Sequence, residues 1–455
     1  MALFQKNNRN NHDVQQKEFN VNNTYIDELV EHYKTRLLTE VNLEQITTLE
    51  EREKKLKIER YINQFMTEEK VVIPRNEKEV LLSKLIDESV GFGPLEPLLQ
   101  DDDITEILVN GPQEIYIEKK GKLEQVNISF KDEAHVRHIV DRVVAPLGRR
   151  IDESSPMVDA RLPDGSRVNA VISPISLGGT LISIRKFRKT PFEMRDLRNY
   201  GTFTSDMEQF LQALVKTKQN ILISGGTGSG KTTLLNALAK EIPYGERIIT
   251  IEDSAELRLD RKNAVGLEAR PPNVEGTGEI SIRQLVKNAL RMRPDRIIVG
   301  EVRGAEAFDM LQAMNTGHEG SLTTVHSNTP ADAINRVEGM VVMAGMDLPT
   351  HIIREYIVGA IDYIVQVQRL TDGTRKLLNI AEVSVNKQNR IEVKDIFFFK
   401  RTGVDDEGGI HGYFTPTGVI PKCLNHLEVF GFNFDRSFFE PKGEITDGLN
   451  RIYTL

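Results

Sequence analysis

The segment 221–235 places glycines, a lysine and threonines between an apolar stretch and a helix-forming stretch. It matches the pattern G-x-x-x-x-G-K-[ST], in which glycines let backbone N–H groups curl around a phosphate and the helix N-terminus adds positive charge. The motif predicts a nucleoside triphosphate site with Mg²⁺, where Lys231 reaches the outer phosphates and Thr232 ligates the metal. The predicted binding residues are Gly225, Gly226, Thr227, Gly228, Ser229, Gly230, Lys231, Thr232 and Thr233.

Acidic residues that follow two apolar stretches decide which reaction the site performs. Glu301 ends the predicted strand 296–301, where nucleotide-hydrolysing enzymes hold an acid that contacts the Mg²⁺ shell or orients water. A second strand, 247–251, runs into a loop that carries Glu252, Asp253 and Glu256. Hydrolysis requires one carboxylate to orient or deprotonate the water. The spacing alone fits a charged surface loop as well, and it does not choose between Glu252 and Glu256.

Two histidines and three arginines are further candidates. His318 precedes the predicted strand 321–326 and His326 ends it, and each is compatible with a structural role or with sensing the phosphates. No third ligand has the spacing for a metal site with them. Arg161, Arg167 and Arg185 lie in an earlier part of the chain, and arginines that reach a nucleotide stabilise the charge of phosphoryl transfer.

Composition narrows the class of protein. The net charge of −8 argues against general DNA coating, and the single cysteine, Cys423, excludes an internal disulfide framework and a cysteine-based zinc site. A reducing, cytoplasmic compartment is therefore expected. No apolar stretch approaches the roughly 18 residues of a membrane helix, so membrane association is expected only through a partner.

With 455 residues, the chain is long enough for two or three domains. From about residue 205 onward, strand and helix patterns alternate, which predicts an α/β fold with a parallel central sheet covered on both faces. The expected organisation is a disordered tail over 1–22, a helical region over 23–99, a smaller α+β domain over 100–190, a hinge over 191–204, and the α/β domain with a C-terminal extension over 205–455.

The four motifs together resemble the hexameric ATPases of type II and type IV secretion and pilus systems. Residues 250–256 resemble the Asp box of that family, residues 290–304 its atypical Walker B motif, and residues 315–328 its His box. Outside these motifs, residues 91–100, 104–111 and 158–169 are similar to the CpaF-like subgroup, which assembles Flp (tight-adherence) pili.

The resemblance implies a RecA-like domain that binds ATP and Mg²⁺ and hydrolyses ATP. It implies that Thr232 and Glu301 hold the metal, that Glu256 is the base with Glu252 second, and that His318 and His326 form the His-box pair. Arg167 and Arg185 match arginines that the preceding domain brings to the nucleotide, and Arg161 is a weaker match. It further implies a cytoplasmic homohexamer that powers pilus assembly or secretion through an inner-membrane platform protein, without direct nucleic-acid binding.

Two other classes of protein share parts of this pattern. A RecA-like nucleic-acid motor would show strand-stimulated hydrolysis and a basic channel, which the acidic composition disfavours. A nucleotide-gated scaffold would bind ATP without turnover, which the acidic residues Glu256 and Glu301 disfavour. A phosphate-release assay on the assembled protein separates the scaffold from the enzyme.

Overall fold

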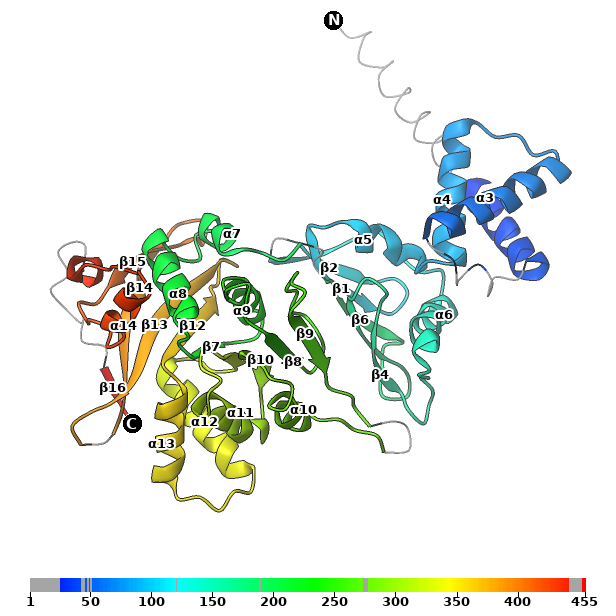
Figure 1. Ribbon diagram of the computed structural model, residues 1–455. Coiled ribbons are helices and arrows are strands. Elements are labelled where there is room, and N and C mark those ends of the chain that lie inside the picture. Colours follow the sequence, from blue (N-terminus) through cyan, green and yellow to red (C-terminus); the bar gives the residue numbers. More distant parts are fainter. Residues whose placement is uncertain are drawn as a thin grey trace, which may run out of the picture. The chain divides into compact units, whose positions relative to one another are not determined.

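The computed structural model describes residues 25–41, 46, 49, 51–119, 121–187, 190–272, 277–388, 390–441 and 452–455 (Figure 1). The expected tail over 1–22 lies outside the described residues. The chain divides into two compact units, Met1–Arg188 and Lys189–Leu455. Among the described helices, none is both long and apolar enough to cross a membrane.

The first unit begins with three helices, drawn in blue in Figure 1: one over residues 25–40, then α3 (Glu51–Glu68) and α4 (Arg75–Ser89). They bury a common apolar core that includes Tyr33, Ile62 and Leu85. This core forms because apolar residues recur at helical spacing in each segment.

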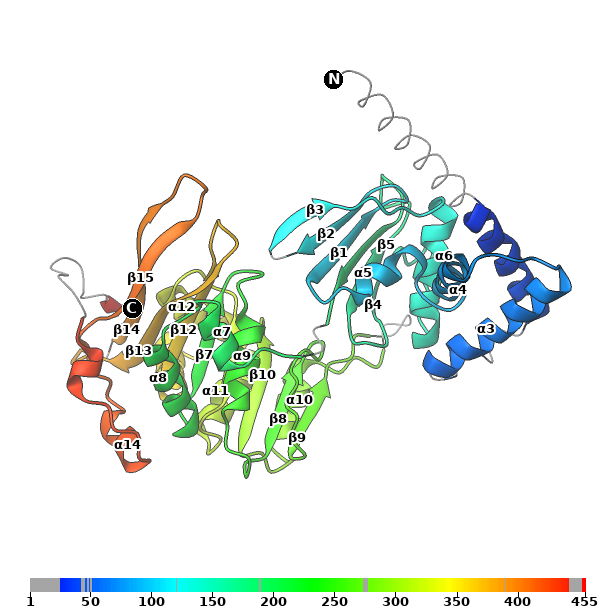
Figure 2. The ribbon, with the colours of Figure 1, turned by 90° about the horizontal axis from the view of Figure 1, so that it is seen from above.

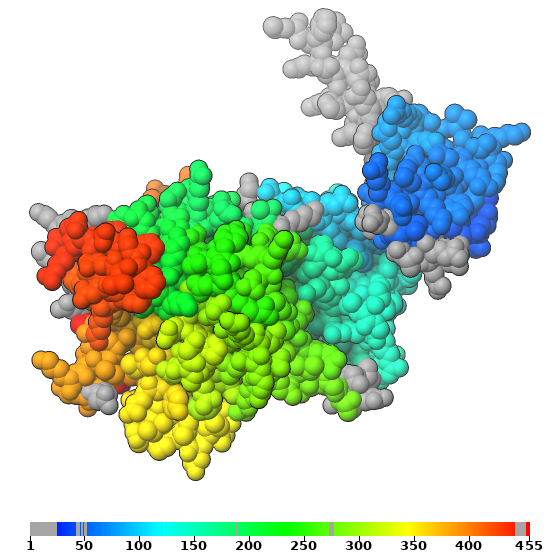
Figure 3. Space-filling model, viewed as in Figure 1, coloured from blue at the N-terminus to red at the C-terminus, as the bar shows by residue number. Residues whose placement is uncertain are grey.

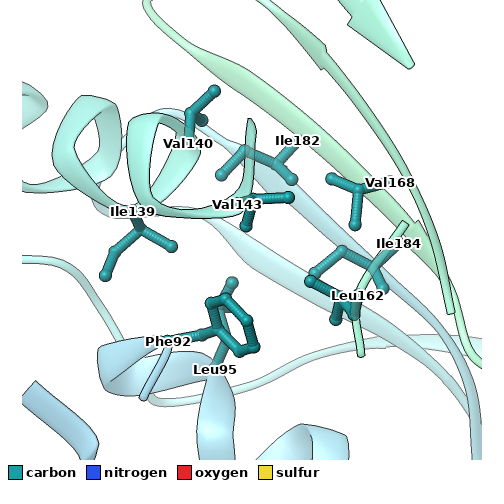
Figure 4. A pocket seen from close by; sticks show the side chains of 9 residues that line it. All are labelled: Phe92, Leu95, Ile139, Val140, Val143, Leu162, Val168, Ile182 and Ile184. Carbon is teal, nitrogen blue, oxygen red and sulfur yellow. The ribbon is translucent and has the colours of Figure 1, made fainter. Parts of the chain in front are cut away.

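An antiparallel six-stranded sheet completes the first unit, in the order β3-β2-β1-β6-β5-β4. Its buried face packs against α6, and a small apolar cavity of about 10 Å³ remains between them, too small to hold a ligand (Figure 4). The elements of this part are η1 (Gly93–Leu95), α5 (Glu96–Gln100), β1 (Ile104–Asn110), β2 (Ile115–Lys119), β3 (Lys122–Gln125), α6 (Glu133–Val144), η2 (Ala145–Leu147), β4 (Met157–Arg161), β5 (Arg167–Val171) and β6 (Leu181–Arg185).

The second unit is built on a ten-stranded sheet whose parallel part has the order β12-β7-β11-β10-β8-β9. Alternate residues of its strands face opposite sides, so Ile221 and Ile223 pack with α8 and α9, while Leu222 packs with α10 to α13. The predicted α/β fold with a parallel sheet covered on both faces is confirmed. The elements are α7 (Met194–Asn199), α8 (Ser205–Lys216), β7 (Ile221–Gly225), α9 (Lys231–Lys240), β8 (Ile248–Glu252), β9 (Ala264–Glu268), α10 (Ile282–Ala289), β10 (Arg296–Val302), α11 (Glu306–Asn315), β11 (Leu322–Val325), α12 (Pro330–Met343), α13 (Thr350–Ala360) and β12 (Tyr363–Arg369).

An antiparallel extension continues the sheet beyond β12, and Figure 2 shows its β14–β15 hairpin projecting from the sheet. The segment that follows, red in Figure 3, packs beside α8, where the rings of Phe439 and Phe210 lie 5.5 Å apart. Its elements are β13 (Arg375–Val385), β14 (Ile391–Val404), β15 (Ile410–Pro416), α14 (Leu424–Val429), η3 (Arg436–Phe439) and β16 (Ile452–Thr454).

The segment expected as a hinge, 191–204, contains helix α7. A capping box between Glu193 and Asp196 starts this helix, and Met194 and Leu197 are buried in the core of the second unit. This helix therefore packs onto the α/β unit, because the burial of two apolar side chains is favourable even for a short helix.

Candidate nucleotide-binding and catalytic site

The glycine-rich loop joins the fully buried strand β7 to helix α9. A Cβ atom on Gly225 would lie 2.4 Å from the carbonyl oxygen of Val367 on the neighbouring strand, so only glycine fits. Gly228 and Gly230 have φ angles of 68° and 94°, which glycine adopts without strain. The loop therefore depends on its glycines for close packing and for its turns, as a phosphate-binding loop requires.

Lys231 lies inside this loop and is only 8% exposed. Its ammonium group donates hydrogen bonds of 3.0 Å to the carbonyl oxygens of Gly225 and Gly226. Thr232 and Thr233, in the first turn of α9, are half-buried. The ammonium group is thus held at the N-terminus of a helix, where the helix dipole also favours an anion.

Glu301 and His326 lie next to Lys231 because β10, β11 and β7 are parallel neighbours whose carboxyl ends share one edge of the sheet. His326 Nε2 is 3.2 Å from Glu301 Oε1 and 3.4 Å from Lys231 Nζ. Burial, followed by the charge of Lys231, lowers the pKa of His326 against the opposing effect of Glu301. A neutral imidazole offers one role per nitrogen, and Nε2 is placed to accept from Lys231, while the nearby Glu301 Oε1 makes no hydrogen bond among the described residues.

Arg303 contacts two acidic residues at this edge of the sheet, Glu301 and Asp253. It was not among the predicted site residues. Its guanidinium donates two hydrogen bonds, of 2.6 and 2.8 Å, to Glu301 Oε2 and lies 3.4 Å from Asp253 Oδ2. The hydrogen bonds that Arg303 donates to Glu301 are the largest cause of the raised pKa of Arg303, and the charge of Glu256 adds to the effect. The signal in the sequence was a cation two residues after Glu301, just beyond the end of β10.

Glu252 and Glu256 differ in their surroundings. Glu252 ends β8 and is 4% exposed, and its Oε1 accepts hydrogen bonds from the backbone N–H groups of Glu256 and Leu257 at 3.0 and 3.1 Å. Its carboxylate therefore shapes the loop that carries Glu256. The side chain of Glu256 is half-buried and close enough to Arg303 to interact with its charge.

His318 lies at the amino-terminal ends of the parallel strands, opposite the ends that carry the phosphate loop. It precedes β11. A few residues further along, Ser321 N donates a hydrogen bond of 2.9 Å to Asn220 Oδ1, at the start of β7. The phosphate loop follows the opposite end of β7. The structure thus brings His326, but not His318, next to Lys231, since the two histidines flank a strand that runs across the sheet.

Arg161, Arg167 and Arg185 form a row across three neighbouring strands of the first unit, here called the arginine row. Arg167 is directly opposite Arg161 on β4 and Arg185 on β6. Arg185 is exposed, and Arg161 and Arg167 are half-buried. The apolar residues that alternate with them along the strands pack against α6. The row brings three positive charges together on one sheet, which makes it suited to binding an anion.

The family of the chain follows from comparison with known proteins. The family profile described as Type II/IV secretion system protein matches residues 88–407. The chain belongs to the type II/IV secretion system family. A putative conjugal transfer protein of Mycobacterium tuberculosis is 38% identical over 330 residues, which cover 71% of this chain and 93% of that protein. The type IV secretion system protein VirB11 of Bartonella henselae is 33% identical and covers 66% of this chain and 95% of its own length.

Members of the type II/IV secretion family are ATPases, and this chain is an ATPase of that family. Among solved structures, the VirB11 ATPase of the Brucella suis type IV secretion system is 31% identical, with a TM-score of 0.35 over 63% of this chain and 94% of that one. The family profile and the relatives confirm the expected relationship to type II and type IV secretion ATPases.

Proposed function

We propose that ATP binds at the loop 225–230 and that hydrolysis takes place at the edge of the sheet that carries Glu301 and His326. The observation that carries this proposal is the chain of contacts from Lys231 through His326 to Glu301 and Arg303, which joins three separate sequence motifs at one place. Lys231 binds the outer phosphates, and the N–H groups of residues 226–233 bind the oxygens around them.

The residues at this edge fit Mg²⁺. A threonine hydroxyl and a carboxylate are oxygen donors, the kind that Mg²⁺ prefers, and the metal keeps its remaining ligands from water and phosphate. Thr232 and Glu301 would hold it, and when bound it neutralises phosphate charge. Glu256 orients and deprotonates the attacking water, while Glu252 fixes the backbone that carries Glu256.

The arginine row supplies positive charge to the phosphates during turnover in this proposal. Arg167 and Arg185 are the residues concerned, with Arg161 beside them. Charge that builds on the phosphate oxygens in the transition state is stabilised by arginines that bind it bidentately.

The assembled enzyme is proposed to be a cytoplasmic hexamer that powers pilus assembly or protein secretion through a membrane platform protein. Support comes from the family and from relatives that are components of conjugal transfer and type IV secretion systems. Light scattering with and without a non-hydrolysable ATP analogue, together with hydrolysis rate against protein concentration, tests the assembly. A monomer whose specific activity does not change with concentration would contradict it.

The decisive test of the site is Lys231→Ala. Loss of the ammonium group should abolish measurable ATP turnover and leave the unfolding temperature within a few degrees of the wild type. Lys287→Ala, on the exposed face of α10, is the matched control and should hydrolyse ATP normally. Unchanged hydrolysis by Lys231→Ala would refute the proposed site.

A further inference from the structure

Two arginines outside every motif discussed above lie beside the phosphate loop, at the facing ends of β12 and β13. Strand β12 runs parallel to β7 with Val367 opposite Gly225, so Arg369 lies just beyond the point where the loop begins. Arg369 and Arg375 are directly opposite each other across the β12–β13 hairpin. The register of the sheet therefore places both arginines next to the phosphate loop.

Contacts with the loop are specific. Arg375 Nε donates a hydrogen bond of 2.9 Å to the carbonyl oxygen of Gly228. Its Cδ atom is 3.3 Å from the position that a Cβ on Gly230 would occupy, and Arg369 Nη1 is 3.7 Å from the corresponding position on Gly228. Both arginine side chains thus lie against the loop, and the glycines leave the space that they use.

The hairpin that carries the pair is held in place by its own hydrogen bonds. Asp372 accepts from the backbone N–H and the hydroxyl of Thr374 at 2.9 and 2.7 Å, and from the N–H of Ile410 on β15 at 3.0 Å. Leu370 at the start of the turn is buried. The backbone that carries both arginines is therefore anchored, so little backbone entropy is lost when they bind a ligand.

Three cationic side chains come together at the phosphate loop. Arg369 and Arg375 are paired across the hairpin, and Lys231 lies within the loop itself. Positive charge gathered at a loop of this shape favours a ligand with several negative charges, such as a polyphosphate. We propose that Arg369 binds the phosphate chain of the nucleotide and that Arg375 is a positioning residue that fixes the loop through Gly228. This inference rests on the proposed binding of ATP at the loop.

Equilibrium competition against a fluorescent ATP analogue tests the inference, with a non-hydrolysable ATP analogue and inorganic tripolyphosphate as competitors. Arg369→Gln should weaken both competitors by the same factor, about tenfold or more, because the lost contact is a charged hydrogen bond to phosphate. Weakening of the ATP analogue alone would assign Arg369 to the base or sugar and overturn the proposal. Unchanged binding of both would overturn it as well.

Arg375→Gln and Arg375→Lys together test whether Arg375 acts through its hydrogen bond to Gly228 or through its positive charge. Lysine keeps the charge but lacks the fork that donates from Nε, so both variants should raise KM for ATP by about tenfold, with unchanged unfolding temperature. Rescue to the wild-type KM by Arg375→Lys would overturn the positioning role. Arg401→Gln is the matched control, since that exposed arginine on β14 hydrogen-bonds Gln368 at the far side of β12.

Lys231→Ala distinguishes this inference from the proposed function. If that variant still binds the ATP analogue and hydrolyses ATP, the loop is not the site and both proposals fail. If it loses turnover while Arg369→Gln and Arg375→Gln bind normally, the loop remains the site and only the role of the arginine pair is refuted.

Discussion

His326 Nε2 lies 3.2 Å from the Glu301 carboxylate, although the two residues belong to different sequence motifs. The same nitrogen is 3.4 Å from Lys231 Nζ. A bound triphosphate that draws the ammonium group towards its own oxygens would leave this nitrogen to Glu301 alone. The contact therefore links the presence of phosphate to the position of the carboxylate that we propose as a metal ligand.

His326→Gln should reduce ATP hydrolysis by about tenfold or more while the affinity for a non-hydrolysable ATP analogue changes little, because the loop itself remains intact. Steady-state phosphate release and equilibrium binding measure the two quantities. The control is His411→Gln, since that histidine pairs only with Asp405 on the exposed β14–β15 hairpin among the contacts described for its side chain. Normal hydrolysis by His326→Gln would remove this residue from the mechanism.

The activity of the wild type should also depend on the neutral form of His326. Its folded pKa is lowered from the ordinary value of 6.5, so more than half of the imidazole is neutral at pH 6.5 and it gains charge as the pH falls. The acidic decline of hydrolysis should therefore have its midpoint below pH 6.5. A midpoint above pH 6.5 would contradict the lowered pKa.

Glu252→Ala should mainly lower stability, whereas Glu256→Ala should mainly lower hydrolysis. The first leaves two backbone N–H groups without their carboxylate, so the free energy of unfolding should fall by about 2 kcal/mol. The second should retain the wild-type unfolding temperature and lose hydrolysis by about a hundredfold or more. Calorimetry and phosphate release on both variants test this division, and the reverse pattern would assign the base to Glu252.

Arg167→Gln and Arg185→Gln should each lower hydrolysis by about tenfold or more without loss of stability. Removing one of several aligned like charges relieves repulsion, so the unfolding temperature should stay the same or rise slightly. Arg150→Gln serves as control because its side chain is exposed and pairs with Asp152. If all three variants hydrolyse ATP at the wild-type rate, the arginine row has no part in turnover.

Asp362 makes stability depend on pH in an unusual direction. Burial raises its pKa to about 6, with smaller contributions from Glu382 and Glu319, against a hydrogen bond from Asn220 N. Between the ordinary value of 3.8 and about 6, the folded state binds more protons than the unfolded state. This contribution to the free energy of unfolding is therefore fully present below pH 3.8 and is lost as the pH rises through 6.

Asp362→Asn should remove that dependence, because asparagine keeps the acceptor oxygen and carries no charge. The variant should be more stable than the wild type at pH 7, by at most about 3 kcal/mol for a shift of about two units, and equally stable near pH 4. Urea unfolding of both proteins at the two pH values provides the measurement. A stability difference that is the same at both pH values would show that Asp362 is not the titrating group.

The phosphate loop, the alternation of strands and helices, and the α/β fold class were all determined by the sequence itself. These properties are local: the glycines from Gly225 to Gly230 and the helix start at Lys231 lie within a few residues of one another. Apolar periodicity likewise reports burial within a single element. The family motifs that follow one another along the chain could therefore be recognised without coordinates.

The tertiary structure alone decided which distant residues meet. Parallel order β7-β11-β10 brings His326 and Glu301 to Lys231, and it leaves His318 at the opposite edge. The register of β12 with β7 and of β5 with its neighbours placed the two sets of arginines. Strand order and register depend on packing between segments that are far apart in sequence, and no local pattern encodes them.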